Sequence, residues 1–555
     1  MLTKIKKMNW ITHRLLALSL FFFSVSSMAE TRLPKNLVAG WDNISQKTIK
    51  QDVSILTADH MQGRLALLKG DALAVEWIKN QFKQIGLKPA AQNSYLQPVK
   101  LIAFMPDKEH SYISLDASGK TIRWKKPDVT TDYRDNIHLQ SVVYFAGYGI
   151  TAPDLNYDDY KGIDVKGKIV LIFEHEPQER NPASIFNGTG NTIYATNRIK
   201  ALNAQKHGAI AVLIAPEPNR KHLSNLERYN RIGGSVSRKK PIPSMALLQD
   251  ELHIPVAVLS DKVANQIAGK SISLASLQAT IDSSVASQST AIPNVTVTIH
   301  DQIKFKKAGI SYNVVGLLEG SDAALKKETI IVSAHHDHDG ISGKQIWHGA
   351  DDNASGTVGV ITLARAIKTN MDTKQGRKLK RSILFVVFAA EERGLLGSYE
   401  MAEHPLRPLK STRAMLNFDM IGRNEAPTPQ TNGMIDIPIE TNNRLNLIGA
   451  HYSPDYKNTV AQQNEYVGLT LDDRFDNETA LNVFFRSDQF PFVLRQIPAL
   501  WWFTGFHPDY HHISDTANKI NYAKMQKILR LAYLSTYAFA NDVTNPAFIK
   551  NPGGN

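Results

Sequence analysis

Five imidazole or carboxylate side chains follow one another where an apolar segment ends. The apolar run 330–332 predicts a buried strand, which ends in His335, His336, Asp337, His338 and Asp339. Such groups are costly to bury beside an apolar core unless something neutralises them, and a divalent metal ion does so. The sequence therefore predicts a metal site at the end of this strand.

Acidic or imidazole side chains also occur at four later stations. They are Asp352 in the turn 349–356, Glu391 and Glu392 after the apolar run 383–388, Asp419 in Asn-Phe-Asp-Met, and the segment 506–516 after the run 501–504. In an open parallel sheet the carboxyl ends of the strands share one edge, where ligands bind. We therefore expect these side chains to converge. The set offers only nitrogen and oxygen donors, which suits zinc or a similar divalent ion.

Strands that alternate with helices position these residues. We expect strands at 313–318, 329–333, 382–388, 414–420 and 499–504, and helices at 354–368, 394–403, 489–496 and 518–540. This alternation predicts an α/β fold, a three-layer α/β/α catalytic domain with a mostly parallel central sheet. Helical spacing over 46–85 and a strand at 94–104 precede it. From 110 to 290 the character changes to short strands, many turns and few long helices, and the Ser-rich segment 283–290 reads as a linker.

The first 29 residues differ from the rest of the 555-residue chain. Lys4, Lys6, Lys7 and Arg14 precede the apolar stretch 15–25 and the small-residue site Ser27-Met28-Ala29. This pattern is typical of a cleaved signal peptide and is short for a membrane span, although a retained amino-terminal anchor is the alternative. The absence of cysteine excludes disulfides and anchoring through a lipidated Cys. We expect export to a periplasm or beyond.

The expected division of the chain is therefore a signal peptide at 1–29, an amino-terminal part of the catalytic domain at 30–109, an inserted domain at 110–290, the catalytic domain at 291–545 and a flexible tail at 546–555. Removal of 1–29 takes away four positive charges and no acidic ones, so the formal net charge falls from +12 to +8. The remaining excess is scattered, and it lacks the basic-aromatic interleaving of nucleic-acid binding. We expect no nucleic-acid partner and no stable membrane anchor after cleavage.

Five segments resemble, in order, those of the secreted di-zinc aminopeptidase family, which also contains glutamate carboxypeptidase and the glutaminyl cyclases. They are Ser-Ala-His-His-Asp-His, Gly-Ala-Asp-Asp-Asn-Ala-Ser-Gly, Ala-Ala-Glu-Glu-Arg-Gly-Leu-Leu-Gly-Ser, Asn-Phe-Asp-Met-Ile-Gly and Tyr-His-His-Ile-Ser-Asp-Thr. The resemblance covers about 295–545 and the helical part of 46–90. The stretch 110–290, with Gly-Tyr-Gly at 147–149 and Asp-Asp-Tyr at 158–160, looks like the mainly-β protease-associated domain often inserted in that family.

The resemblance implies a role for each matching position. His335 and Asp419 would hold one zinc ion, Glu392 and His511 the other, and Asp352 would bridge the two. Glu391 would be the general base, and Asp337 would orient His335. A cis peptide bond is expected between Asp352 and Asn353. The implied function is a zinc exopeptidase acting on peptides, first of all an aminopeptidase. A carboxypeptidase, a one-zinc glutaminyl cyclase and a non-catalytic binding module are the alternatives.

Several residues have competing interpretations. Asp351 rivals Asp352 as the bridging residue unless it caps the following helix. His512 rivals His511 as a ligand unless it is a surface residue or supports the ligands from outside. The extra imidazoles of His336, His338 and His348 line the cleft in one reading, and His507 contacts substrate or fixes a turn. Other residues with competing interpretations are the stripe 501–503 (sheet core or substrate pocket), Asp488 (orientation of a ligand, binding of a substrate amine, or surface pair with Arg486), and Arg423 and Arg486 (grip on a substrate carboxylate or surface). Around Gly63 and Arg64 the sequence departs from the family, because Leu65-Ala66-Leu67-Leu68 follows.

Overall fold

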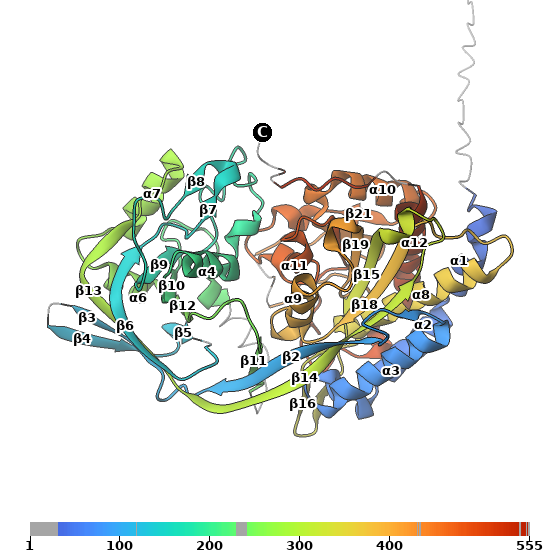
Figure 1. Ribbon diagram of the computed structural model, residues 1–555, viewed down its shortest axis with the longest axis horizontal. Helices are drawn as coiled ribbons and strands as arrows, with labels where there is room; N and C mark the ends of the chain where they lie inside the picture. The colour runs from blue at the N-terminus through green and yellow to red at the C-terminus, as the bar shows by residue number, and fades with distance from the viewer. Residues whose placement is uncertain are drawn as a thin grey trace, which may run out of the picture.

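The computed structural model describes residues 32–228, 241–542, 545–550 and 552, except residues 118, 132, 430, 432 and 433. The predicted signal peptide at 1–29 lies outside the described residues. Two lobes are joined by a pair of long antiparallel strands, β2 (Leu96–Pro106) and β14 (Ile303–Leu318), as Figure 1 shows. Among the helices of the described ranges, none has the length and apolar character needed to cross a membrane.

A ten-stranded sheet forms the larger lobe. Its strand order is β11-β2-β14-β18-β15-β19-β22-β20-β21, where the edge strand β11 spans Ser244–Leu247, and β1 (Lys88–Pro89) is paired to β14. The central strands run parallel: β18 (Ser382–Phe388), β15 (Thr329–His335), β19 (Thr412–Phe418) and β22 (Ala499–Phe503). On both sides of this block the adjoining strand, β14 or β20 (Arg444–Ile448), pairs antiparallel, and β21 (Thr470–Asp472) closes the sheet. The predicted parallel arrangement thus holds for the centre, whereas the whole sheet is mixed.

Helices cover both faces of this sheet. Successive strand residues point to opposite faces, so Ile330 and Val332 pack in one core and Ile331 in another. The first core is closed by α2 (Gln46–Leu56), α3 (Lys69–Ile85), α8 (Gly356–Asp372), α10 (Pro454–Asn464) and α12 (Tyr522–Asn541), with α1 (Val38–Asn43) beside α8. The second core is closed by α9 (Leu396–Glu403) and α11 (Phe490–Val493). The predicted three-layer architecture is confirmed.

The smaller lobe is an eight-stranded sheet with its own core. The order is β4 (Lys120–Trp124), β3 (Tyr112–Ala117), β13 (Thr290–Asp301), β6 (Ile137–Phe145), β9 (Ile169–Phe173), β10 (Ala211–Ala215), β12 (Val256–Leu259) and β5 (Val129–Thr131). Helices α4 (Asn197–Lys206), α6 (Asp261–Ala268) and α7 (Leu274–Ser284) accompany it. A short hairpin of this lobe is formed by β7 (Thr151–Ala152) with β8 (Tyr157–Asp158). A second hairpin, β16 (Gly340–Ser342) with β17 (Gln345–Trp347), follows β15 of the larger lobe.

The chain passes from the small sheet to the large one later than residue 290. Strand β13 pairs with β3 and β6 in the small sheet, and β14 begins the return at Ile303. The Ser-rich segment expected as a linker instead spans the end of α7 and the start of β13. Its many hydroxyl side chains suit exposed strand positions as well as linkers, which is why composition did not separate the two. In addition, β11 (Ser244–Leu247), inside the expected insertion, pairs with β2 in the large sheet.

Part of the tail expected to be flexible packs on the catalytic domain. The Ser453 hydroxyl donates to the Ala547 carbonyl over 2.8 Å, and the backbone N–H of Ile549 donates to the Tyr452 carbonyl over 2.8 Å. The Phe548 ring stacks on Tyr452 with 5.6 Å between centroids. One aromatic side chain and three hydrogen bonds, the third from the Ala547 N–H to Asp455, therefore dock residues 547–549. The surrounding Pro, Gly and Asn residues conceal this feature in the sequence.

Candidate active site

The residues predicted to bind metal lie at the carboxyl ends of the central strands. His335 ends β15, Asp419 follows β19 directly, and Glu392 lies in the short turn after β18. Asp352 lies in the turn that leads into α8, and His511 lies in the loop after β22. Because β18, β15, β19 and β22 are parallel neighbours, these ends share one sheet edge and bring the five side chains together.

Asp352 lies between two histidines. Its Oδ1 is 3.5 Å from Nε2 of His335, and its Oδ2 is 3.3 Å from Nε2 of His511. Nε2 of His335 is also 3.5 Å from Oδ1 of Asp419, and Nε2 of His511 is 3.3 Å from Oε2 of Glu392. Ligand atoms about 2.0–2.2 Å from a tetrahedral zinc ion lie roughly 3.3–3.5 Å apart, so each half of this cluster has a suitable spacing.

Burial and charge also fit a pair of cations. Nε2 of His335 is buried and has no hydrogen-bond partner among the described residues. Burial, and then the Glu392 carboxylate, raises the pKa of Asp352 well above its usual range. Burial likewise raises the pKa of Glu391, whose Oε2 lies 3.7 Å from Nε2 of His335. Carboxylates crowded in this way stay ionised only beside positive charge, which divalent ions supply.

Asp337 positions the Glu391–Glu392 turn. Its carboxylate accepts hydrogen bonds from the backbone N–H of Glu391 (3.0 Å) and of Glu392 (3.3 Å). Nδ1 of His335 lies 3.2 Å from the Asp337 carbonyl oxygen and 3.7 Å from its carboxylate. Asp337 therefore contacts His335 chiefly through its backbone, while its carboxylate holds the adjacent acidic residues.

The turn that carries Asp352 is held by Asp515. The Asp515 carboxylate accepts from the backbone N–H groups of Asp351 and Asp352 at 3.0–3.1 Å. The expected cis peptide between Asp352 and Asn353 is present. The Asp351 carboxylate accepts from the Gly422 N–H at 2.6 Å and lies 3.2 Å from Nε2 of His507, so it makes no cap on α8. Asp351 and His507 thus pair with each other beside the site.

Asp339 orients His511. Its Oδ2 lies 3.0 Å from Nδ1 of His511, and its Oδ1 accepts from the Arg393 guanidinium at 2.9 Å. A carboxylate on the second ring nitrogen fixes the orientation of a metal-binding imidazole. The rival His512 instead places Nδ1 2.7 Å from the Tyr510 carbonyl.

The three extra imidazoles have different surroundings. Nδ1 of His338 lies 2.7 Å from Oε1 of Glu392, inside the cluster. His336 is buried with Nε2 3.2 Å from the Tyr312 carbonyl, and burial lowers its pKa to about 4. His348 lies 3.0 Å from Asp59 at the surface. Only His338 touches a predicted ligand.

Arg64 supports the site although its role was not predicted. Its side chain is fully buried and donates to the carbonyls of His336 (2.7 Å), Leu56 (2.9 Å), His348 (2.7 Å) and Gly349 (2.9 Å). One guanidinium thus joins the loop after β15 to the loop before Asp352. The apolar run 65–68 right after Arg64 was the only sequence signal that this charge is buried.

Comparison with known proteins matches both lobes. Residues 313–535 match the sequence profile of Peptidase family M28, and residues 139–267 match the PA domain. The catalytic domain belongs to peptidase family M28. The resemblance to this peptidase family and the presence of a PA domain, both expected from the sequence, are therefore confirmed, and the protein is a metallopeptidase.

Relatives of this M28 peptidase extend over most of the chain. It is 26% identical to leucine aminopeptidase 2 of Trichophyton equinum over 514 residues, which cover 86% of this chain and 83% of the relative. It is 27% identical to leucine aminopeptidase 2 of Arthroderma otae, covering 80% and 74%. The aminopeptidase from Aneurinibacillus sp. strain AM-1 shares the fold, with a TM-score of 0.50 at 19% identity over 92% of this chain and 96% of that one.

The PA domain uses its Gly-Tyr-Gly and Asp-Asp-Tyr segments for packing. The buried Asp159 carboxylate accepts from the backbone N–H groups of Tyr148 and Ile150 at 3.0 and 3.1 Å and from the Tyr157 hydroxyl at 2.7 Å. Gly147 has φ +51° and lies directly against this carboxylate. The two segments therefore form one turn structure.

Other polar and aromatic residues of the M28 domain also have clear roles. Trp501 and Trp502 are buried in the sheet core, and the Trp501 indole donates to the Asp419 carbonyl at 2.9 Å. Asp488 is fully buried, so the alternative of a surface pair with Arg486 is wrong. Arg423 donates to Asp509 at 2.8 Å, and Arg486 donates to the Tyr510 hydroxyl at 3.3 Å.

A cavity of about 620 Å³ lies beside the M28 site. Asp339 and Arg393 line it on the catalytic side. Met105 on β2 and Tyr112 and Thr130 of the PA domain line it elsewhere. Both domains therefore border the space next to the residue that orients His511.

Proposed function

We propose that this protein is an exported aminopeptidase that removes amino-terminal residues from peptides with the aid of two zinc ions. The observation that carries the proposal is the position of Asp352, whose two carboxylate oxygens face different histidines. His335 and Asp419 would hold one ion, Glu392 and His511 the other, and Asp352 would bridge them. The match to Peptidase family M28 and the donor set support this assignment.

When bound, zinc polarises a carbonyl and lowers the pKa of water. The residues of the chain supply the proton transfers. Glu391 takes the proton from the attacking water and passes it to the leaving amine, as a general base and then a general acid. Asp337 fixes the backbone of Glu391, so the base stays beside His335. Surrounding burial excludes bulk water and strengthens these electrostatic effects.

Action at the amino terminus is supported by the pairing of Arg423 with a carboxylate. A carboxypeptidase needs a cation for the terminal carboxylate, and Arg423 was one candidate. Arg423 is engaged by Asp509 and lies 3.8 Å from Asp515. The relatives that match most of the chain are leucine aminopeptidases. Export is supported by the signal-peptide pattern of 1–29.

The test is turnover of a set of aminoacyl p-nitroanilides and of one peptide in free and N-acetylated forms, with metal analysis of the same sample. We expect cleavage of substrates with a free amine only, loss of activity with chelator, recovery with zinc, and at least two zinc ions per chain. Stepwise release of residues from the carboxyl end of the N-acetylated peptide would contradict the aminopeptidase proposal.

A further inference from the structure

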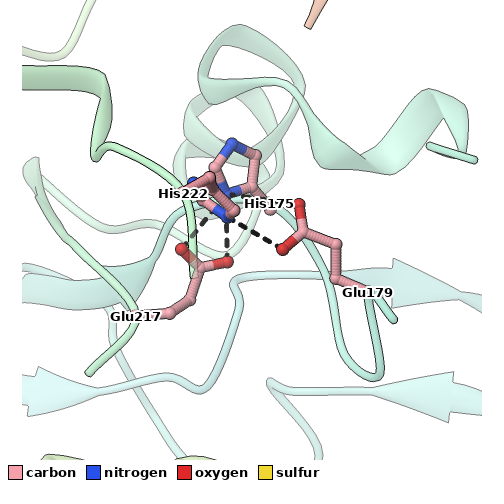
Figure 2. Close-up of side chains that lie close together, drawn as sticks. All are labelled: His175, Glu179, Glu217 and His222. Atoms are coloured by element: carbon pink, nitrogen blue, oxygen red, sulfur yellow. Dashed lines mark hydrogen bonds and ion pairs between the residues drawn. The ribbon is translucent and has the colours of Figure 1, made fainter. Parts of the chain in front are cut away.

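The PA domain contains a second cluster of residues that could hold a metal ion. Figure 2 shows His175, Glu179, Glu217 and His222 turned toward one another. His175 follows β9 by two residues, and Glu217 follows β10 by two residues. Because β9 and β10 are parallel neighbours, with Phe173 opposite Ala215, both side chains leave the sheet at the same edge. Glu179 and His222 come from the loops that follow.

The distances suit a small divalent ion. Nδ1 of His175 lies 3.1 Å from both carboxylate oxygens of Glu217 and 3.9 Å from Oε1 of Glu179. Nε2 of His222 lies 2.8 Å from Oε2 of Glu179. One ligand atom from each of the four residues can be chosen so that all lie within 4.8 Å of one another. Four ligands in a tetrahedron around zinc are separated by roughly 3.3–3.5 Å, so small side-chain adjustments are enough.

Hydrogen bonds on the outer side of each imidazole leave the inner nitrogen free to coordinate. Nδ1 of His222 lies 2.9 Å from the Leu223 carbonyl and donates its proton there. Nε2 of His175 lies 2.9 Å from the Asn482 side chain, which accepts through its oxygen once the amide is turned to satisfy its neighbours. Nε2 of His222 and Nδ1 of His175 then each present a lone pair toward a carboxylate. A positive species between them is required.

Among the described residues, no hydrogen bond from the neighbouring Lys200 reaches a carboxylate of the cluster. The buried Lys200 ammonium donates to the carbonyls of Phe173 and His175. The adjacent carboxylates have other donors: Glu174 accepts from the Asn225 N–H, and Glu176 accepts from Thr192. Within the cluster, the buried Oε1 of Glu179 has no hydrogen-bond partner among the described residues. His175 and Glu217 are almost completely buried, at 1% and 2% exposure.

We propose that His175, Glu179, Glu217 and His222 bind a divalent transition-metal ion, zinc by the donor set, at a site separate from the catalytic cluster. Two carboxylates and two neutral imidazoles carry a charge of −2, which a divalent ion neutralises. An entry path exists, because Glu179 and Glu217 also line a cavity of about 360 Å³ with Gln178 and Arg220. Two protonated imidazoles are the competing way to neutralise the cluster.

The position of the site points to a role in fastening the two domains. Asn482, the outer partner of His175, belongs to the catalytic domain. In the same contact, the Arg228 guanidinium donates to the Ala480 carbonyl at 3.0 Å, and the Tyr452 hydroxyl donates to the Asn191 carbonyl at 2.6 Å. An ion that fixes the His175 ring therefore fixes the ring that meets the catalytic domain.

The experiment is crystallography of the full-length protein after dialysis in metal-free buffer, with anomalous maps on both sides of the zinc edge. We expect a zinc peak among the four side chains in addition to the catalytic peaks. In His222→Gln this peak is lost and the catalytic peaks remain, whereas in Asp419→Asn it remains. Absence of the peak in wild-type protein whose catalytic site is loaded would overturn the proposal in favour of protonated imidazoles.

Thermal unfolding in solution is a second test of the PA-domain site. Thermal unfolding of the full chain should show a midpoint that rises with zinc in Asp419→Asn, because binding to the folded state alone stabilises it. In the double variant Asp419→Asn/His222→Gln that rise should be smaller. An equal rise in both proteins counts against the PA-domain site, and the Asp419→Asn crystals show separately where the remaining ions bind.

Discussion

Nδ1 of His338 lies 2.7 Å from Oε1 of Glu392, and the other oxygen of that carboxylate faces His511. The sequence offered His338 only as an extra imidazole in the cleft. In the structure it holds one oxygen of a predicted zinc ligand, so that Oε2 is turned toward the cluster. His338 is therefore expected to tune metal binding without replacing any of the five predicted ligands.

Substitution of His338 by Ala should lower zinc affinity about 10–100-fold, the range seen when an outer partner of a metal ligand is removed. The Glu392 carboxylate would lose its fixed orientation and gain rotamer freedom. Competition of the protein with a chromogenic chelator measures the affinity. His348→Ala is the matched control, because Nε2 of its ring pairs with the exposed Asp59 and not with a predicted ligand. Equal affinities of the two variants would show that the contact has no influence on the metal.

Substitution of Glu391 by Gln should reduce kcat about 10²–10⁴-fold, because an amide cannot accept the proton from water. Zinc content should stay at the wild-type value, since the five predicted ligands are untouched. Glu400→Gln, on helix α9, is the control for the change of charge. Glu391 could instead be a metal ligand, because Glu391, His335 and Asp419 lie close enough together to hold one ion. Loss of zinc from Glu391→Gln would make Glu391 a ligand and not a base.

The position of the catalytic cluster could be predicted because its information is local. Four of the five predicted ligands end or follow a strongly apolar strand, and parallel strands deliver their ends to one edge. Asp352 lies in the acidic turn before α8. The metal-binding roles of these residues stay predictions. Arg64 and Asp515 could not be predicted, because they act on backbone groups that are far away in sequence, such as the Gly349 carbonyl and the Asp351 N–H. Every residue has a backbone carbonyl and all but proline have an N–H, so residue types do not show which of these groups a side chain will bind.

The point at which the chain crosses from the small sheet to the large one could not be predicted from the sequence, for a different reason. The same holds for the PA-domain cluster. The Ser- and Thr-rich residues before and within β13 fit a linker as well as a strand, and only pairing with β3 and β6 decides. His175, Glu179, Glu217 and His222 have no regular spacing, and they meet because β9 and β10 end side by side. Sequence reading finds sites built on apolar periodicity and misses those built on loop conformation.

Substitution of Arg64 by Lys should destabilise the catalytic domain by on the order of 3 kcal/mol. A lysine ammonium cannot reach the four carbonyls that Arg64 joins, so buried acceptors lose their donors at about 1–3 kcal/mol each. Urea unfolding followed by tryptophan fluorescence measures the loss. Arg123→Lys, on an exposed strand of the PA domain, is the control. If both variants unfold at the same urea concentration, the Arg64 network contributes nothing to stability.

A comparison of two glycines of the PA domain can distinguish the cost of backbone strain from the cost of a steric clash. Gly147 (φ +51°) and Gly162 (φ +83°) both have left-handed conformations, which cost a residue with a Cβ about 1–2 kcal/mol. A Cβ on Gly147 would also lie 2.1 Å from Oδ1 of Asp159, whereas a Cβ on Gly162 would meet nothing within 4 Å. Displacement of Asp159 would weaken its bonds to Tyr148, Ile150 and Tyr157.

Gly147→Ala should therefore destabilise the PA domain by about 2–5 kcal/mol, the sum of left-handed strain and overpacking of about 1–3 kcal/mol. Gly162→Ala should lose only about 1–2 kcal/mol. Hydrogen exchange of peptides from 143–173, read by mass spectrometry, localises the loss to this domain and leaves the catalytic sheet as an internal reference. Similar exchange in the two variants would mean that the Asp159 carboxylate moves aside at no cost, and that the turn does not depend on its position.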